Sequence, residues 1–66
     1  MKNISIDNGM TFVEPAEAIE QCDWDVIVMM MDDDTRENVS YELAPCTNLE
    51  FLIRYLELAP FDLIVG

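Results

Sequence analysis

The chain has 66 residues, of which 52% are apolar, 14 are acidic and only three are Lys or Arg, so its formal net charge at pH 7 is −11. This balance excludes direct binding to nucleic acid and disfavours an anionic membrane surface, because both require cationic side chains. The apolar content is too high for a disordered chain, and we expect one small folded domain over residues 1–66.

The N-terminal segment is too polar for a signal peptide, and no apolar run approaches the roughly 18 residues that span a membrane. We therefore expect a cytoplasmic protein that is monomeric. The only cysteines are Cys22 and Cys46, with no CxxC spacing and no histidine in the chain. These two residues are expected to be small apolar core residues and not a disulfide or zinc ligands.

Two short β-like runs, residues 3–7 and 10–13, flank an Asn-Gly pair. Asn8 and Gly9 both tolerate the positive φ of a type I′ turn, so the pattern predicts an antiparallel β-hairpin. The side chains expected to face inward are Ile4, Ile6, Met10 and Phe12.

Two helices are predicted next. Pro15 suits the first helical position, since its missing N–H is not needed there, and the helix should run over residues 15–22. Asp23 can cap a second helix over residues 24–31, which is apolar nearly all round and is therefore expected to lie at the centre of the core. A buried strand through the β-branched residues 26–28 is the alternative.

The segment from Met29 to Glu37 places three methionines directly before three aspartates. Asp34 and Glu37 have the spacing of a capping box, which predicts a helix over residues 35–43. Asp32 and Asp33 would then lie near the C-terminus of the preceding helix, where the helix dipole disfavours anions. We interpret these two carboxylates as candidates for contact with a partner.

A second capping box, from Thr47 to Glu50, predicts a largely buried helix over residues 48–59, which Pro60 ends. The apolar run 61–65 is expected to form a third strand. The predicted fold is α+β: a small antiparallel sheet, made of the N-terminal hairpin and the C-terminal strand, packed on about four short helices.

Catalysis is not expected, because the chain has no histidine, its single lysine is Lys2, and two glycines cannot make a phosphate-binding loop. A chain this short cannot readily build a substrate cleft around paired carboxylates. The aspartate run does not continue as an EF-hand, since Glu37 and Leu43 occupy the places of its glycine and its bidentate glutamate. We expect no metal site and no cofactor.

The acidic residues are concentrated in one part of the chain, since residues 3–35 contain nine of them and no Lys or Arg. B-DNA carries about one negative charge per 1.7 Å of its axis, and a rigid fold with similar charge density can occupy a basic groove that binds DNA. The candidate partner-binding residues are Glu17, Glu20, Asp23, Asp25, Asp32, Asp33, Glu37 and Glu42.

Three stretches, I-D-N-G-M-T-F-V, M-D-D-D-T-R-E and E-L-A-P-C-T-N-L-E-F-L-I-R-Y-L-E, resemble parts of small acidic proteins that accompany bacterial mobile elements such as phages. Some of these are anti-CRISPR or antirestriction proteins that imitate DNA. The resemblance implies an inhibitor of a nucleic-acid-binding host-defence complex, and a CRISPR effector complex is one such partner. It transfers no residue roles.

Two other functions remain open at this stage. The chain could be a small regulatory or antitoxin-like interaction module, in which an apolar patch near Met30 matters more than charge. It could also be an accessory domain whose charge only prevents aggregation.

Overall fold

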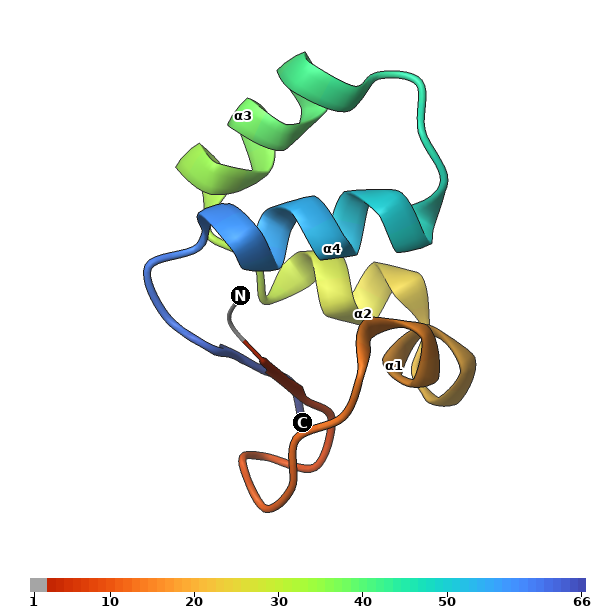
Figure 1. Ribbon diagram of the computed structural model, residues 1–66. Coiled ribbons are helices and arrows are strands. Elements are labelled where there is room, and N and C mark those ends of the chain that lie inside the picture. The colour runs from red at the N-terminus through yellow and green to blue at the C-terminus, as the bar shows by residue number, and fades with distance from the viewer. Residues whose placement is uncertain (1–2) are drawn as a thin grey trace.

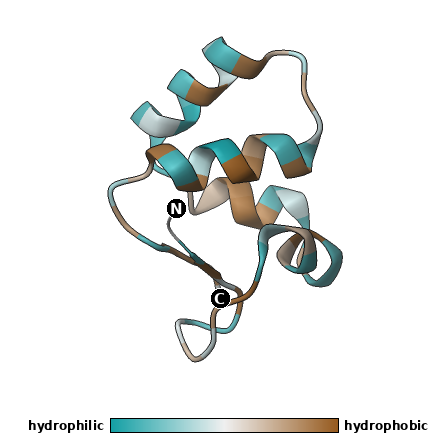
Figure 2. Ribbon diagram, in the orientation of Figure 1, coloured by the Kyte–Doolittle hydropathy of each residue, from teal (hydrophilic) through white to brown (hydrophobic). Residues whose placement is uncertain are grey.

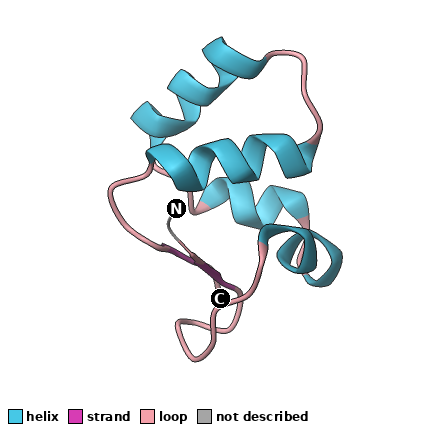
Figure 3. Ribbon diagram, viewed as in Figure 1, coloured by secondary structure: helices cyan, strands magenta, loops and turns pink. Residues whose placement is uncertain are grey.

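The computed structural model describes residues 3–66, so Lys2 lies outside the described part of the chain. Four helices and one small sheet make an α+β fold, which confirms the predicted class (Figure 1, Figure 3). No helix among the described residues is long and apolar enough to cross a membrane. The elements in chain order are β1 (Ile4–Ser5), α1 (Pro15–Gln21), α2 (Trp24–Met29), α3 (Asp33–Leu43), α4 (Asn48–Leu58) and β2 (Leu63–Ile64).

The sheet differs from the prediction in its pairing. β1 and β2 run parallel, with Ile4 opposite Leu63 and Ser5 opposite Ile64, so the predicted antiparallel sheet is wrong in this respect. All four helices lie between the two strands in sequence, and such a long connection can return the chain to the same end of the sheet. The N-terminal hairpin is reduced to one antiparallel bridge between Ile4 and Val13.

The turn at the tip of this hairpin forms as predicted, with φ of 60° at Asn8 and 87° at Gly9. Beyond the turn, however, Met10 and Phe12 are 81% and 47% exposed, so their predicted inward positions are wrong. Ile4 is buried as predicted, and Ile6 is partly buried.

The side chain of Asp7 explains why the pairing stops. Its carboxylate accepts hydrogen bonds from the hydroxyl and the backbone N–H of Thr11, at 2.6 and 2.9 Å, and from the Ser5 hydroxyl at 2.7 Å. These bonds, those from Thr11 above all, hold the pKa of Asp7 at about 2. The loop is thus closed by a side chain and not by a strand ladder.

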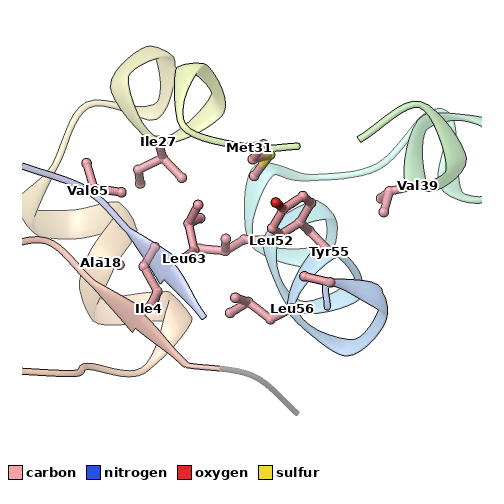
Figure 4. Packing of buried hydrophobic residues seen from close by; sticks show 11 residues of the cluster. Ile4, Ala18, Ile27, Met31, Val39, Leu52, Tyr55, Leu56, Leu63 and Val65 are labelled. Carbon is pink, nitrogen blue, oxygen red and sulfur yellow. The ribbon is translucent and has the colours of Figure 1, made fainter. Parts of the chain in front are cut away.

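The core is built on α4, which packs against both α1 and α3. Figure 4 shows its side chains Leu52 and Leu56 beside Leu63 and Ile4 of the strands. Fully buried apolar side chains come from β1, from all four helices and from the residue after β2, and they are Ile4, Ala18, Ile27, Val39, Leu52, Leu56 and Val65.

The helix α2 is not the central helix that its composition predicts. Ile27 is fully buried, but Val26, Met29 and Met30 are 42%, 77% and 51% exposed. With six residues, α2 makes fewer than two turns and can turn only one side toward the core.

The first residue of α2, Trp24, packs edge-to-face on Phe51 of α4, with ring centroids 5.9 Å apart. The alternative of a strand over residues 26–28 is wrong, because these residues are helical.

Candidate functional site

The helix α3 packs against the rest of the protein along one narrow side and exposes mostly polar residues on the others. It buries Thr35 and Val39, with Leu43 partly buried one turn later, so a single narrow stripe faces the rest of the protein. Figure 2 colours most of the other residues of α3 as hydrophilic. The residues opposite the stripe are therefore held outward by the packing of the stripe itself.

Three carboxylates lie on this outward side. Asp33 and Asp34 are in the first turn of α3. Glu37 follows in the next turn, four residues after Asp33 and three residues after Asp34. Side chains with this spacing are neighbours on a helix surface. All three are exposed, and we call them the α3 acidic face.

The cap of α3 is Asp32 and not the predicted Asp34. One carboxylate oxygen of Asp32, Oδ2, accepts hydrogen bonds from the backbone N–H and the hydroxyl of Thr35, at 3.0 and 2.9 Å. These two bonds lower the pKa of the Asp32 carboxyl. The backbone N–H of Asp32 donates to the Tyr55 hydroxyl at 2.8 Å, which ties the start of α3 to α4.

This cap corrects the electrostatic interpretation of the aspartate run. The helix α3 begins at Asp33, so Asp33 and Asp34 occupy its first turn, where the positive end of the helix dipole favours anions. The prediction that Asp32 and Asp33 lie at an unfavourable helix C-terminus is wrong. Their charges are compatible with local stability, and the argument for a binding role must come from exposure and position.

A pair of alanine substitutions tests the cap. Asp32→Ala should lower the melting temperature by about 4–8 °C, because the loss of an N-cap side chain typically has an effect of this size in a small domain. Asp34→Ala removes the same charge two residues further along the chain, and it should lower the melting temperature by less. Thermal melts of both variants by circular dichroism make the comparison, and equal losses would contradict the assignment of Asp32 as the cap.

The two arginines of the described chain engage some of the acidic candidates. Arg36 pairs with Asp33 at 3.0 Å, but the Asp33 side chain is 84% exposed, so this pair contributes little to stability. Arg54 of α4 contacts Glu42 of α3 at 2.8 Å and lies 3.8 Å from Glu57. The bond to Glu42 is the main cause that raises the pKa of Arg54. Glu42 thus links α3 to α4, a contact that the sequence analysis missed.

The remaining candidates lie on other elements. Glu17 and Glu20 are one turn apart on α1, Asp23 precedes α2, and Asp25 is in its first turn. All four are exposed. In Figure 1, α4 lies between α1 and α3. The eight candidates therefore divide into an α3 group and an α1–α2 group and do not form one cluster.

Four exposed residues of α3 were not among the sequence-derived candidates: Asp34, Asn38, Ser40 and Tyr41. Asp34 had been assigned to the cap, and Tyr41, which is 95% exposed, had no assigned role. The signal was present in the helical spacing, since the apolar residues Val39 and Leu43, four positions apart, share one face of the helix, and Tyr41 between them must then lie on another.

Within residues 3–66, no group of three or more His, Cys, Asp or Glu side chains is arranged to hold a metal ion. Cys22 and Cys46 are free thiols, both partly buried. The chemistry available on the α3 acidic face is that of fixed negative charge.

Comparison with known proteins bears on the same region. The family model described as anti-CRISPR protein AcrIC5 matches residues 20–58, which is more than half of the chain. The matched segment contains all of α2, α3 and α4 and the end of α1, and it leaves both strands outside. No curated protein and no solved structure gives a match.

Proposed function

Since the chain belongs to the AcrIC5 family of anti-CRISPR proteins, we propose that it inhibits a CRISPR–Cas complex by acting as a DNA mimic. Family membership makes the chain an anti-CRISPR inhibitor. The proposal concerns how it inhibits: its carboxylates occupy a basic surface on which the complex receives DNA. Occupying that surface requires no chemical step.

The observation that carries this proposal is the geometry of the α3 acidic face. At a rise of about 1.5 Å per residue, Glu37 lies about 4.5 Å from Asp34 and about 6 Å from Asp33 along the helix axis. Phosphates of one DNA strand are spaced about 3.4 Å along theirs, so neighbouring charges in the two patterns have separations of the same order. A cationic groove that accepts a strand of phosphates can thus accept this row of carboxylates.

The attachment of α3 to the rest of the fold supports the same proposal. The Asp32 cap, the buried Val39 and the contact between Glu42 and Arg54 hold the helix in one position. Charges that are already fixed lose less conformational entropy on binding than charges on a mobile segment.

We assign different roles to the two groups of candidates. Asp33 and Glu37, with Asp34 added from the structure, are proposed as direct contacts. Asp32 and Glu42 add negative charge beside these contacts. They also stabilise the fold, Asp32 by capping α3 and Glu42 by pairing with Arg54. The α1–α2 group, Glu17, Glu20, Asp23 and Asp25, is proposed to steer association through its long-range field.

We propose that the protein acts as a monomer in the cytoplasm of a bacterial host, where CRISPR–Cas complexes meet DNA from a phage or another mobile element. Its partner is a basic nucleic-acid-binding complex, and the protein itself does not bind nucleic acid.

One observation favours a second way of binding. Met29 and Met30 are 77% and 51% exposed, and exposed methionines make adaptable apolar contacts. An interface centred on these side chains would depend on burial of apolar area and not on charge.

The dependence of affinity on salt separates the two. If carboxylates dominate, the affinity for the purified CRISPR–Cas complex should fall by about tenfold or more between 0.1 M and 1 M salt, as the Debye length shortens from about 10 Å to about 3 Å. Biolayer interferometry across this range measures it. An affinity that is unchanged at 1 M salt would support the methionine patch and contradict DNA mimicry.

A further inference from the structure

A cleft of about 290 Å³ lies between the connection from α2 to α3 and the segment that leads from α4 into β2. Residues 30–32 line one side, residues 60–64 line the other, and Tyr55 of α4 also lines the cleft. Figure 4 shows Met31 and Tyr55 next to each other at this place in the core. The volume is at the lower limit of small-molecule sites, so the cleft fits one side chain better than a metabolite.

The walls of the cleft combine exposed apolar surface with two carboxylates. Phe61 is 79% exposed, although Leu63, two residues further along the same segment, is buried. Met30 on the opposite side is 51% exposed. Asp32 and Asp62 supply the carboxylates, and no Lys or Arg is among the described residues that line the cleft.

Each carboxylate has one oxygen to spare. Asp32 uses Oδ2 for the cap of α3, and Asp62 uses Oδ1 to accept a hydrogen bond from the backbone N–H of Asn3 at 3.1 Å. Among residues 3–66, neither Asp32 Oδ1 nor Asp62 Oδ2 has a hydrogen-bond partner. The cleft therefore presents two hydrogen-bond acceptors beside the exposed ring of Phe61, and no residue of the described chain donates to these two oxygens.

We propose that this cleft binds an arginine side chain of the partner. A guanidinium is planar and carries five N–H donors, so it can bond to carboxylates at its edge while its face stacks on an aromatic ring such as Phe61. Its apolar stem can lie against Met30. A lysine would gain the charge interaction but not the stacking, and a neutral side chain would leave both carboxylates unmatched.

The proposal deepens the proposed function and rests on it for the source of the arginine, which is the DNA-receiving surface of the CRISPR–Cas complex. Asp32 borders both the cleft and the first turn of α3, so one basic surface can reach the cleft and the α3 acidic face together. Phe61 and Asp62 lie outside the segment that matches the family. The cleft thus combines residues inside the matched segment, among them Asp32 and Tyr55, with residues outside it.

The test uses small probes and the full chain without any CRISPR–Cas complex. N-acetyl-arginine amide is titrated to tens of millimolar and followed by backbone amide NMR, with the lysine amide and the neutral citrulline amide as matched probes. Arginine should give saturable shifts at residues 30–32, 55 and 61–64, with an affinity about twofold to fivefold above that of lysine. Citrulline should give none.

Variants assign the effect to the cleft. Phe61→Ala should remove the preference for arginine over lysine, and Asp62→Asn should weaken binding of both, while neither exposed side chain is needed for the core. Tyr41→Ala and Asp25→Asn change an exposed aromatic residue and an exposed carboxylate elsewhere, and both should bind arginine as the parent chain does.

Three results would overturn the proposal. The first is the absence of saturable shifts at the cleft residues, and the second is that citrulline binds as tightly as arginine. The third is that the shifts occur at all exposed carboxylates and do not change in the Phe61→Ala variant. Competition with DNA is a separate measurement on the complex. Loss of the arginine site with competition intact would reject only the cleft, whereas a functional cleft without competition would reject only DNA mimicry.

Discussion

Neutralising the α3 acidic face, with Asp33→Asn, Asp34→Asn and Glu37→Gln combined, is expected to weaken binding to the CRISPR–Cas complex by about 3-fold to 150-fold. Each exposed charge pair contributes about 0.2–1 kcal/mol, and three contributions convert to this range. Most of the loss should appear as slower association, because charge complementarity acts mainly on the encounter. The melting temperature should fall by a few degrees and not more, since all three side chains are exposed and only the interaction of Asp33 and Asp34 with the helix dipole is lost.

A second triple variant with the same change in net charge provides the control. Glu17→Gln, Glu20→Gln and Asp25→Asn remove three charges from the α1–α2 group. If position matters, this variant should lose less affinity than the α3 variant in the same surface plasmon resonance assay. Equal losses of affinity would mean that only the total charge matters. If both variants bind as tightly as the parent chain, the charge does not contribute to binding and serves only to prevent aggregation.

The largest expected effect on stability comes from Leu52 of α4. Its side chain is fully buried where α4 meets the rest of the core, and Leu→Ala substitutions at such positions destabilise by about 2–5 kcal/mol. At about 0.05–0.15 kcal/mol per residue, a domain of this length has only about 3–10 kcal/mol in total. Leu52→Ala should therefore leave a large unfolded fraction at 37 °C, detectable by urea titration.

The same helix offers the matched control. Leu58 has an identical side chain that is 38% exposed, and Leu58→Ala should have a much smaller effect. If the two substitutions destabilise equally, α4 is not packed as the structure has it, and the position of α3 against it comes into question.

Features that depend on a few neighbouring residues could be predicted from the sequence. The capping box is present with both of its hydrogen bonds, between Thr47 and Glu50, and α4 begins at the residue that it predicts. Pro15 stands at the start of α1 as predicted, and α4 ends at Leu58, one residue before the predicted end. In these places one or two side chains decide the backbone conformation.

Features that depend on distant parts of the chain could not be predicted in this way. The direction of β2 relative to β1 follows from the path of the four helices between them. The choice of Asp32 as cap depends on its neighbours: Thr35 donates both a backbone N–H and a hydroxyl, and the Tyr55 hydroxyl, 23 residues away, accepts the backbone N–H of Asp32. Three adjacent aspartates are equivalent until such contacts distinguish them.

The candidate site was predicted in part for the same reason. Exposure of the acidic side chains follows from their charge, and all eight candidates are exposed. Their division between α3 and the α1–α2 group depends on how the helices pack around α4, which periodicity alone does not reveal.

If the protein occupies the surface that receives DNA, then it and DNA must exclude each other on the CRISPR–Cas complex. The direct measurement is the apparent Kd of the complex for fluorescent target DNA, determined by anisotropy at several concentrations of the protein. Competition predicts an apparent Kd that rises in proportion to the protein concentration without reaching a plateau, and a shallower rise for the α3 triple variant. An apparent Kd that stays unchanged while the protein is bound, with DNA and protein held together on one complex, would contradict DNA mimicry.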